Sequence, residues 1–140
     1  MMMGPILDFD VLRDDHALLW QDAIARLAAA IRRLRGTHEA EDVLALLHFN
    51  RLHMHLWHGQ RASAVTDIQA FPRKRVLNVF LAGGRGGLDE LIEWTRPNGV
   101  LEEWAFDRWQ CDWITYTGRK GWGELISCDV MGEVALRERG

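Results

Sequence analysis

The stretch VLNVFLAGGRGGLDELIEW, residues 76–94, contains the change of pattern that decides the fold. It begins with an apolar run rich in β-branched and aromatic residues, which favours a strand. Residues 83–87 follow, and four of these five are glycines. From Leu88 onward the apolar positions recur at helical spacing, which predicts an amphipathic helix. Several folds use a strand that runs through a glycine-rich turn into a helix to hold a phosphate group.

The length and charge of the chain limit what it can be. Its 140 residues suit a single domain, 1–140, that buries a hydrophobic core. A formal charge of −3 gives no general attraction to nucleic acid, and no stretch is apolar enough for a membrane span. The first residues lack the pattern of a secretory signal, and the two cysteines, Cys111 and Cys128, suit a reducing compartment. These features favour a soluble protein of the cytosol.

The N-terminal part, 1–50, is predicted to be helical. Apolar residues recur every three or four positions between residues 18 and 34, with arginines on the other face, which indicates one long amphipathic helix. Gly36 can end this helix in the left-handed conformation. Thr37 is then the expected N-cap of a second, shorter helix that reaches about Leu47. No obvious strand precedes these helices.

The remaining part, 51–140, is predicted to form a sheet with further helices. Short apolar stretches between residues 52 and 84, punctuated by HGQ and FPRKR, indicate three strands in an antiparallel meander. The helix from Leu88 is interrupted at RPNG and resumes through VLEEWAFDRW, because proline and glycine disfavour a continuous helix. DWITYTG is a fourth strand, and the tail allows a short helix and a last strand near residues 133–137. This order of elements predicts an α+β fold.

Three phrases in this order resemble a known family. They are SAVTDIQAFPRKRVLNVFLAGG, GLDELIEW and TGRKGW, which lie between residues 63 and 122. They resemble a family of small bacteriophage-encoded proteins described as GNAT-like, after the Gcn5-related N-acetyltransferases, and the match covers roughly residues 53–125. The resemblance implies a mixed, mostly antiparallel sheet flanked by helices, here with the long N-terminal amphipathic helix in addition.

The resemblance also implies a role for the glycine turn. In enzymes of this fold the turn and the positive end of the following helix hold the pyrophosphate of coenzyme A. The corresponding cofactor-binding residues would be Gly83, Gly84, Arg85, Gly86 and Gly87. The family pattern, an Arg or Gln followed two residues later by Gly-x-Gly or Gly-x-Ala, is not reproduced, so the loop looks too short for a whole diphosphate. Asp89 would compete with a bound anion, and a tight turn that needs glycine for positive φ explains the same residues.

Acetyl transfer also needs a base for the amine and an acid for the departing thiolate. The resemblance implies a base on the middle strands, and Asp67 in AVTDIQ is the candidate. The acid in such enzymes is a tyrosine in the helix after the next strand. The only tyrosine here, Tyr116, lies in the strand before GRKGW, and the following segment has Trp122 instead. Asp67 and Tyr116 are thus the candidate catalytic residues of a set that departs from the family pattern.

Histidines and basic residues suggest two weaker alternatives. His53, His55 and His58 lie close together, and the first two would share one face of a strand, as metal ligands must. No carboxylate or cysteine pair lies nearby in sequence, so no metal site is expected. The basic stretches at residues 72–75 and 118–122 could line one rim and meet phosphates or an acidic partner. The excess of acidic residues disfavours nucleic acid as that partner.

Two functional hypotheses follow from these patterns. The first is a phage-encoded, noncatalytic virion or assembly component, such as a head–tail or internal virion protein. It would contact other phage proteins or a second copy of itself through the long helix and some of its seven tryptophans. It would need no cofactor, and it would reside in the host cytoplasm during infection and be incorporated in the virion. The second is an acetyl-CoA-dependent N-acetyltransferase with an unknown acceptor amine. The first is preferred, because an enzyme needs all its groups in register and a scaffold needs only the fold.

Overall fold

The computed structural model describes residues 5–6, 10, 12–34, 36–50, 52–95, 99–111, 113–116 and 133–135. Along the chain these form β1 (Pro5–Ile6), α1 (Asp14–Arg32), α2 (Ala40–Phe49), β2 (Met54–His58), β3 (Ser63–Ala70), β4 (Arg75–Gly83), α3 (Leu88–Thr95), α4 (Val100–Glu103), the π-helical turn η1 (Trp104–Arg108), β5 (Trp113–Tyr116) and β6 (Glu133–Ala135). The predicted α+β class is confirmed.

The strands form one mixed sheet in the order β1-β2-β3-β4-β5-β6. Neighbouring strands are antiparallel except β4 and β5, which run parallel. The parallel pairing extends from Val76 opposite Trp113 to Val79 opposite Tyr116. Among the described residues, the last part of β4 therefore has no partner on that side. The register with β3 shifts after Val65, which gives β4 one additional residue there. The predicted antiparallel meander of β2, β3 and β4 is confirmed.

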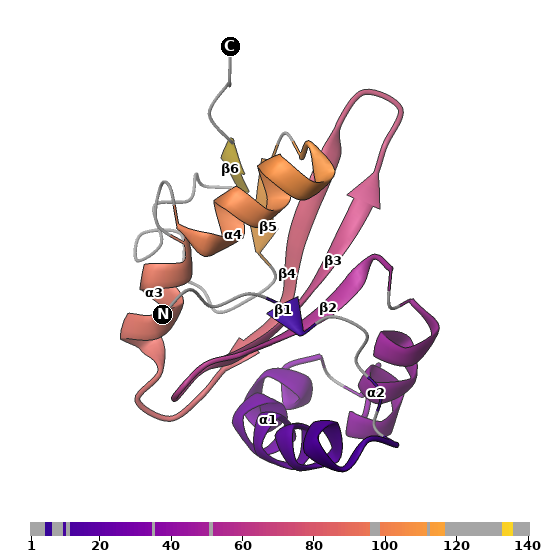
Figure 1. Ribbon diagram of the computed structural model, residues 1–140, viewed down its shortest axis with the longest axis vertical. Coiled ribbons are helices and arrows are strands. Elements are labelled where there is room, and N and C mark those ends of the chain that lie inside the picture. Colours follow the sequence, from indigo (N-terminus) through magenta and orange to yellow (C-terminus); the bar gives the residue numbers. More distant parts are fainter. Residues whose placement is uncertain are drawn as a thin grey trace.

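Helices α1 and α2 cover one face of the sheet, and α3 and α4 lie on the other (Figure 1). On α1 the buried positions recur every three or four residues, as the sequence pattern predicts, because that spacing places side chains on one side of a helix. The core between α1, α2 and the sheet includes Trp20, Leu27, Val43, Leu47, Leu56, Val65 and Leu81. This packing fixes α1 across the sheet and places its C-terminal half near the end of β4.

The opposite core is rich in aromatic side chains. It includes Trp57, Leu77, Val79, Trp94, Leu101, Ala105 and Ile114, with Trp104 and Trp109 packed against it. The indole N–H of Trp57 donates to the hydroxyl of Thr66 at 2.9 Å, so this buried polar atom is satisfied. The tryptophans at 94, 104 and 109 thus belong to the core, which is the more frequent role of such residues on a helical stripe.

Several element boundaries differ from the sequence prediction. A short strand, β1, precedes the helices and pairs with β2, although no strand was evident there. Helix α2 begins at Ala40 and its N-cap is Glu39, whose backbone N–H is accepted by the Asp42 carboxylate in a capping box. The expected N-cap, Thr37, instead donates its hydroxyl to the carbonyl of Leu34.

Other predictions at the chain level have mixed outcomes. Gly36 has φ of +81°, in the left-handed region, but α1 already ends at Arg32 with Arg33 as its C-cap, so Gly36 belongs to the turn after the helix and does not end it as predicted. The short helix predicted in the tail lies outside the described residues. No helix in the described part of the chain has the length and apolar character that crossing a membrane requires.

Candidate ligand-binding site

The glycine turn between β4 and α3 depends on glycine at two positions. Gly84 and Gly86 have φ of +139° and +70°, where other residues are strained. The N–H of Gly87 donates to the carbonyl of Gly84 at 3.0 Å, which closes a tight turn. A Cβ added at Gly84 would collide with the backbone of Arg61 and Ala62 in the β2–β3 loop. The turn therefore needs glycine for its backbone geometry and for its close packing.

Gly83 brings β4 against α1. A Cβ at this position would lie 2.5 Å from the backbone carbonyl oxygen of Arg26, a distance that real Cβ atoms do not show. The contact sets the C-terminal half of α1 beside the glycine turn. Only glycine permits this approach without moving the helix.

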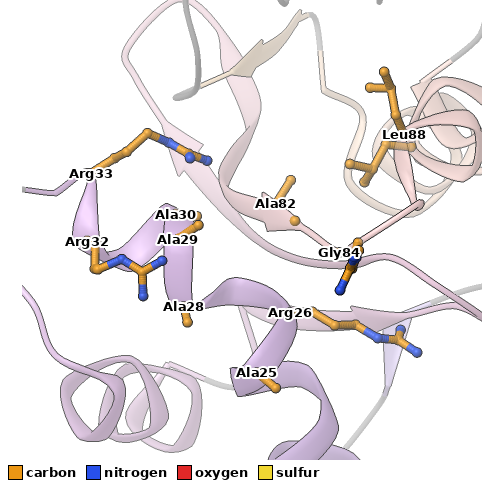
Figure 2. Close-up of a pocket in the computed structure, with 13 residues that line it drawn as sticks. Ala25, Arg26, Ala28, Ala29, Ala30, Arg32, Arg33, Ala82, Gly84 and Leu88 are labelled. Atoms are coloured by element: carbon orange, nitrogen blue, oxygen red, sulfur yellow. The ribbon is translucent and has the colours of Figure 1, made fainter.

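A cleft of about 590 Å³ lies between α1 and the start of α3, with the glycine turn along its wall (Figure 2). Four arginines line it: Arg26, Arg32, Arg33 and Arg85. The remaining lining residues are Gly83, Gly84, Leu88, Leu91 and five alanines, at positions 25, 28, 29, 30 and 82. We call this the arginine cleft. Its described lining residues include no carboxylate, and Asp89 is not among them.

The arginines of the cleft differ in how they are held. Arg32, Arg33 and Arg85 are exposed, and the first two stand at the C-terminal end of α1, where cations favour the helix dipole. In Figure 2, Arg32 and Arg33 stand on α1 at the side of the cleft opposite Gly84 and Leu88, and Arg26 lies below Gly84 in this view. Guanidinium groups bind phosphate oxygens with strong, directional hydrogen bonds, so this lining favours an anion.

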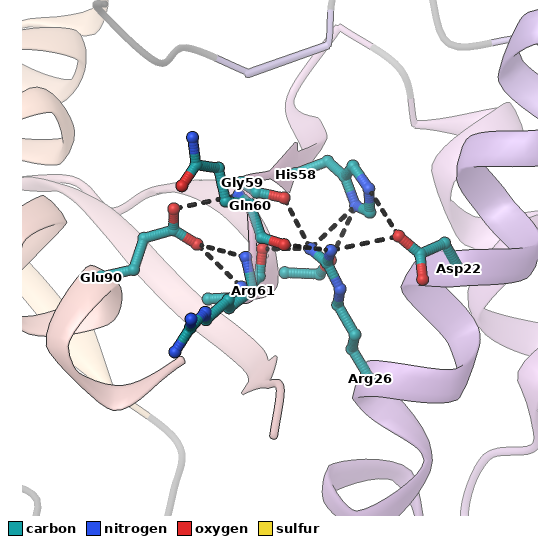
Figure 3. A network of polar contacts seen from close by, with 9 residues as sticks. Asp22, Arg26, His58, Gly59, Gln60, Arg61 and Glu90 are labelled. Carbon is teal, nitrogen blue, oxygen red and sulfur yellow. Dashed lines mark hydrogen bonds and ion pairs between the residues drawn. The ribbon is translucent and has the colours of Figure 1, made fainter. Parts of the chain in front are cut away.

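Arg26 is already engaged by the protein (Figure 3). Its guanidinium donates to the carbonyl oxygens of Gly59 at 2.7 Å, Gln60 at 2.8 Å and Ala62 at 2.9 Å. It also forms an ion pair with Asp22 at 3.1 Å, one turn earlier on α1. Arg26 thus ties α1 to the β2–β3 loop, and its role at the edge of the cleft is structural.

His58, at the end of β2, joins the same network (Figure 3). Its Nε2 lies 3.1 Å from the Asp22 carboxylate, and its Nδ1 lies 2.8 Å from the hydroxyl of Ser63. Burial lowers the pKa of His58 and the neighbouring Arg26 lowers it further, while Asp22 and Glu90 act in the opposite direction. His58 is therefore a hydrogen-bonding residue of this network and does not share a site with His53 and His55.

Glu90 on α3 completes the network from the other side (Figure 3). Its carboxylate accepts backbone N–H groups of Gln60 at 3.0 Å, Arg61 at 3.0 Å and Ala62 at 2.7 Å. Burial alone would raise the pKa of Glu90, but these three N–H groups and the Arg26 guanidinium together lower it. The β2–β3 loop is thus held between α1 and α3, which fixes the two walls of the arginine cleft relative to each other.

Of the two candidate catalytic residues, Asp67 lies away from this cleft. The Asp67 carboxylate accepts from the side-chain amides of Gln69 at 3.0 Å and Asn78 at 3.1 Å. Tyr116 is opposite Val79 in the parallel pair, so its backbone is close to that of Asn78, and its side chain lies outside the described residues. Asp67 is not among the described residues that line the arginine cleft, whereas Gly83, Gly84 and Arg85 of the predicted cofactor-binding residues are.

The histidines of β2 pack against aromatic rings. The ring of His53 lies 5.3 Å from that of Trp109, and His55 lies 5.3 Å from Trp104, centroid to centroid. Burial lowers the pKa of His55 to about 4, with smaller contributions from His53 and Arg108. In the described part of the chain no three His, Cys, Asp or Glu side chains are grouped to hold a metal ion. The alternative of a zinc site therefore has no support from this geometry.

The network in Figure 3 could not be predicted from the sequence. Arg26 and Glu90 both look like solvated charges on amphipathic helices, and their partners in the β2–β3 loop are 28 to 36 residues away. The HGQR stretch, residues 58–61 at the end of β2, is the one available signal of such a network. The backbone N–H and C=O groups of a loop that leaves the sheet need hydrogen-bond partners from elsewhere.

No family model, curated protein or solved structure matches this chain. The arginine cleft and the network beside it are therefore the features from which a function can be inferred.

Proposed function

We propose that this chain is a GNAT-like protein that works by binding, and that the arginine cleft holds a phosphate-bearing ligand such as coenzyme A. The observation that carries this proposal is the lining of the cleft: the exposed arginines Arg32, Arg33 and Arg85 beside the structural Arg26, the glycine turn, and no carboxylate among its described residues. Such a lining attracts an anion and provides guanidinium donors for it.

The order of elements supports the GNAT-like scaffold. Two helices, an antiparallel meander, a glycine turn and a helix are followed by a strand parallel to β4. The pairing of β4 with β5 stops at Val79 within the described residues, so β4 continues toward the turn without that neighbour. The resemblance to GNAT-like phage proteins implies a mixed, mostly antiparallel sheet flanked by helices, and this order of elements is compatible with it.

The shape of the cleft supports an organic phosphate over a free inorganic ion. A volume of about 590 Å³ lies within the range of small-molecule sites. Alanines and leucines supply an apolar wall, and the N-terminus of α3 adds a positive dipole end. Arg32 and Arg85 are exposed side chains on opposite walls of the cleft. A ligand with both a phosphate and an apolar arm would use both kinds of surface.

The absence of a proton acceptor in the described lining favours binding without acetyl transfer. The described lining consists of alanine, arginine, glycine and leucine, and Asp67 does not belong to it. The expected setting remains a virion or assembly component whose partners are other phage proteins or a second copy of the chain. Large apolar side chains are available for such contacts, since Leu12, Phe49 and Leu52 are 86%, 81% and 73% exposed.

Calorimetric titration with coenzyme A tests the proposed ligand. We expect binding that weakens with salt and that Arg85→Glu reduces at least tenfold, because one guanidinium contact is replaced by repulsion. Arg73→Glu is the matched control, since Arg73 is exposed in the β3–β4 connection and lies outside the cleft. Equal affinity in both variants would contradict the proposed site.

The assembly role has a separate test. Mass spectrometry of purified phage particles should detect the chain at a fixed copy number relative to the portal or capsid protein. A chain that is abundant in infected cells and missing from particles and from assembly intermediates would contradict this role, whatever the cleft binds.

An acetyl-CoA-dependent N-acetyltransferase is the second candidate. The arginine cleft favours it, because such an enzyme must hold the same cofactor. Incubation of the protein with radiolabelled acetyl-CoA and mixed amines should then give labelled amide, and Asp67→Asn should abolish the labelling. Coenzyme A binding with no labelled product supports the binding role instead.

A further inference from the structure

A second cavity, of about 460 Å³, lies between α2 and the sheet. We call it the Asp67 cavity. Its apolar wall includes Leu46 of α2, Met54 of β2 and Phe80 of β4. Its polar side includes Asp67, Gln69 and Asn78. The cavity therefore combines one carboxylate with an apolar surface large enough for a short aliphatic chain.

A chain of hydrogen bonds fixes the direction of the carboxylate. Thr115 donates its hydroxyl to the amide oxygen of Asn78 at 2.8 Å, and Asn78 donates its amide to Asp67 Oδ1 at 3.1 Å. Gln69 donates to the other oxygen, Oδ2, at 3.0 Å. An ionised carboxylate can accept about four hydrogen bonds. Two acceptor positions of Asp67 therefore remain beyond the two that these amides use.

Asp67 is the only carboxylate among the described residues that line the cavity, and the basic side chains among them are the histidines His38 and His53. No lysine or arginine is among the described residues that line it, and no ion pair of Asp67 is formed with the described part of the chain. A half-buried carboxylate beside an apolar wall is most stable with a cationic partner. A primary ammonium group provides the charge and the N–H donors that the remaining acceptor positions need.

We propose that the Asp67 cavity binds a small organic ammonium ion, a primary amine carried on an apolar chain. The ammonium group lies against Asp67, and the chain lies against Leu46, Met54 and Phe80. Asn78 acts as a positioning residue, because it holds the carboxylate toward the cavity and is itself held by Thr115.

The two cavities lie in succession along β4. Asn78 and Phe80 line the Asp67 cavity, and Ala82 and Gly83 line the arginine cleft. Residues two apart on a strand are separated by about 7 Å. A site for a cation thus follows directly on a site for an anion. The amine site stands on its own cavity and does not depend on the proposed function; if both sites are occupied, the bound amine is the acceptor class for the second candidate function.

Titration with hexylammonium chloride, in the absence of coenzyme A, tests the amine site. We expect the backbone amide signals of residues 67 and 78 to shift saturably in heteronuclear NMR spectra. The neutral analogue 1-hexanol should bind at least tenfold more weakly, because it cannot form the charged contact with Asp67. This comparison uses the unmodified protein and needs no variant. Equal binding of 1-hexanol, or tighter binding of hexanoate, would overturn the proposal.

Asp67→Asn gives the second arm, since it keeps the shape and removes the charge. It should weaken hexylammonium binding at least tenfold while Asp89→Asn, an exposed carboxylate on α3, leaves it unchanged. Unaltered binding by Asp67→Asn, shifts confined to the arginine cleft, or no shift at millimolar amine would each overturn the amine site. If hexylammonium does not bind, the proposal that the arginine cleft binds coenzyme A still stands. If coenzyme A does not bind, the proposal of an amine site in the Asp67 cavity still stands.

Discussion

Replacing Glu90 tests the network that holds the two walls of the arginine cleft. Glu90→Ala removes the acceptor of three backbone N–H groups, of which that of Ala62 belongs to a residue with 0% exposure. Water can replace the carboxylate at the exposed Gln60 and Arg61. A buried hydrogen bond to a charged group contributes about 1.5–3 kcal/mol. We therefore expect the free energy of unfolding to fall by about 2 kcal/mol.

Urea denaturation at neutral pH measures this loss, and Asp89→Ala is the matched control. Asp89 is exposed in the same first turn of α3, so its replacement costs only its share of the helix-dipole interaction, about 0.5 kcal/mol. An equal loss in both variants would refute the role of Glu90 as the anchor of the β2–β3 loop.

The pH dependence of Glu90→Gln adds an independent check. Because the folded protein lowers the pKa of Glu90, its contribution is present above the ordinary pKa of a glutamate, about 4.3, and is lost as the pH falls through the lowered value. The stability difference between wild type and Glu90→Gln should thus be clear at pH 7 and shrink steadily below about pH 4. A difference that stays constant down to pH 3 would contradict the charged contact.

Three further predictions concern stability. The folded protein lowers the pKa of His55 to about 4, so as the pH falls the unfolded chain binds the proton first, and the free energy of unfolding of wild type should fall by up to about 3 kcal/mol between pH 6.5 and 4. Thermal unfolding of His55→Leu should show a flatter dependence of stability on pH, and a dependence identical to that of wild type would contradict this prediction. In urea unfolding, Gly83→Ala should lower the free energy of unfolding more than Gly36→Ala does. The added Cβ at residue 83 is forced against α1, whereas the Cβ at residue 36 meets only open space and costs the strain of alanine at positive φ, about 1 kcal/mol. Trp57→Phe should lower the unfolding free energy by about 1–3 kcal/mol, because the hydroxyl of Thr66 loses its buried donor, and a loss under 0.5 kcal/mol on the same measurement would contradict that.

The parts of the fold that depend on local pattern could be predicted from the sequence. The apolar periodicity of α1 and the short apolar stretches of β2, β3 and β4 each determine an element within a few residues. A tight turn that needs glycine at positive φ was one explanation of residues 83–87, and Gly84 and Gly86 have positive φ. Strand β1 could not be found, because two residues carry no periodicity and form a strand only by pairing with β2.

The candidate site depended on contacts between distant residues, which the sequence does not display. Glu90 reaches the β2–β3 loop across 28 to 30 residues, and Asp67 meets Asn78 across 11. Arg32 has an adequate explanation at a helix end, so nothing in the sequence placed it beside the glycine turn. Only the packing of α1 on β4, made possible by Gly83, brings these groups around one cleft.

Mapping coenzyme A onto the protein by heteronuclear NMR tests the central claim most directly. The account predicts saturable shifts of the backbone amides of Gly84, Gly86 and Leu88, and much smaller shifts with pantetheine, which lacks the phosphates. Shifts of equal size with pantetheine, or shifts that leave the glycine turn unaffected while other surfaces respond, would contradict a phosphate site in the arginine cleft.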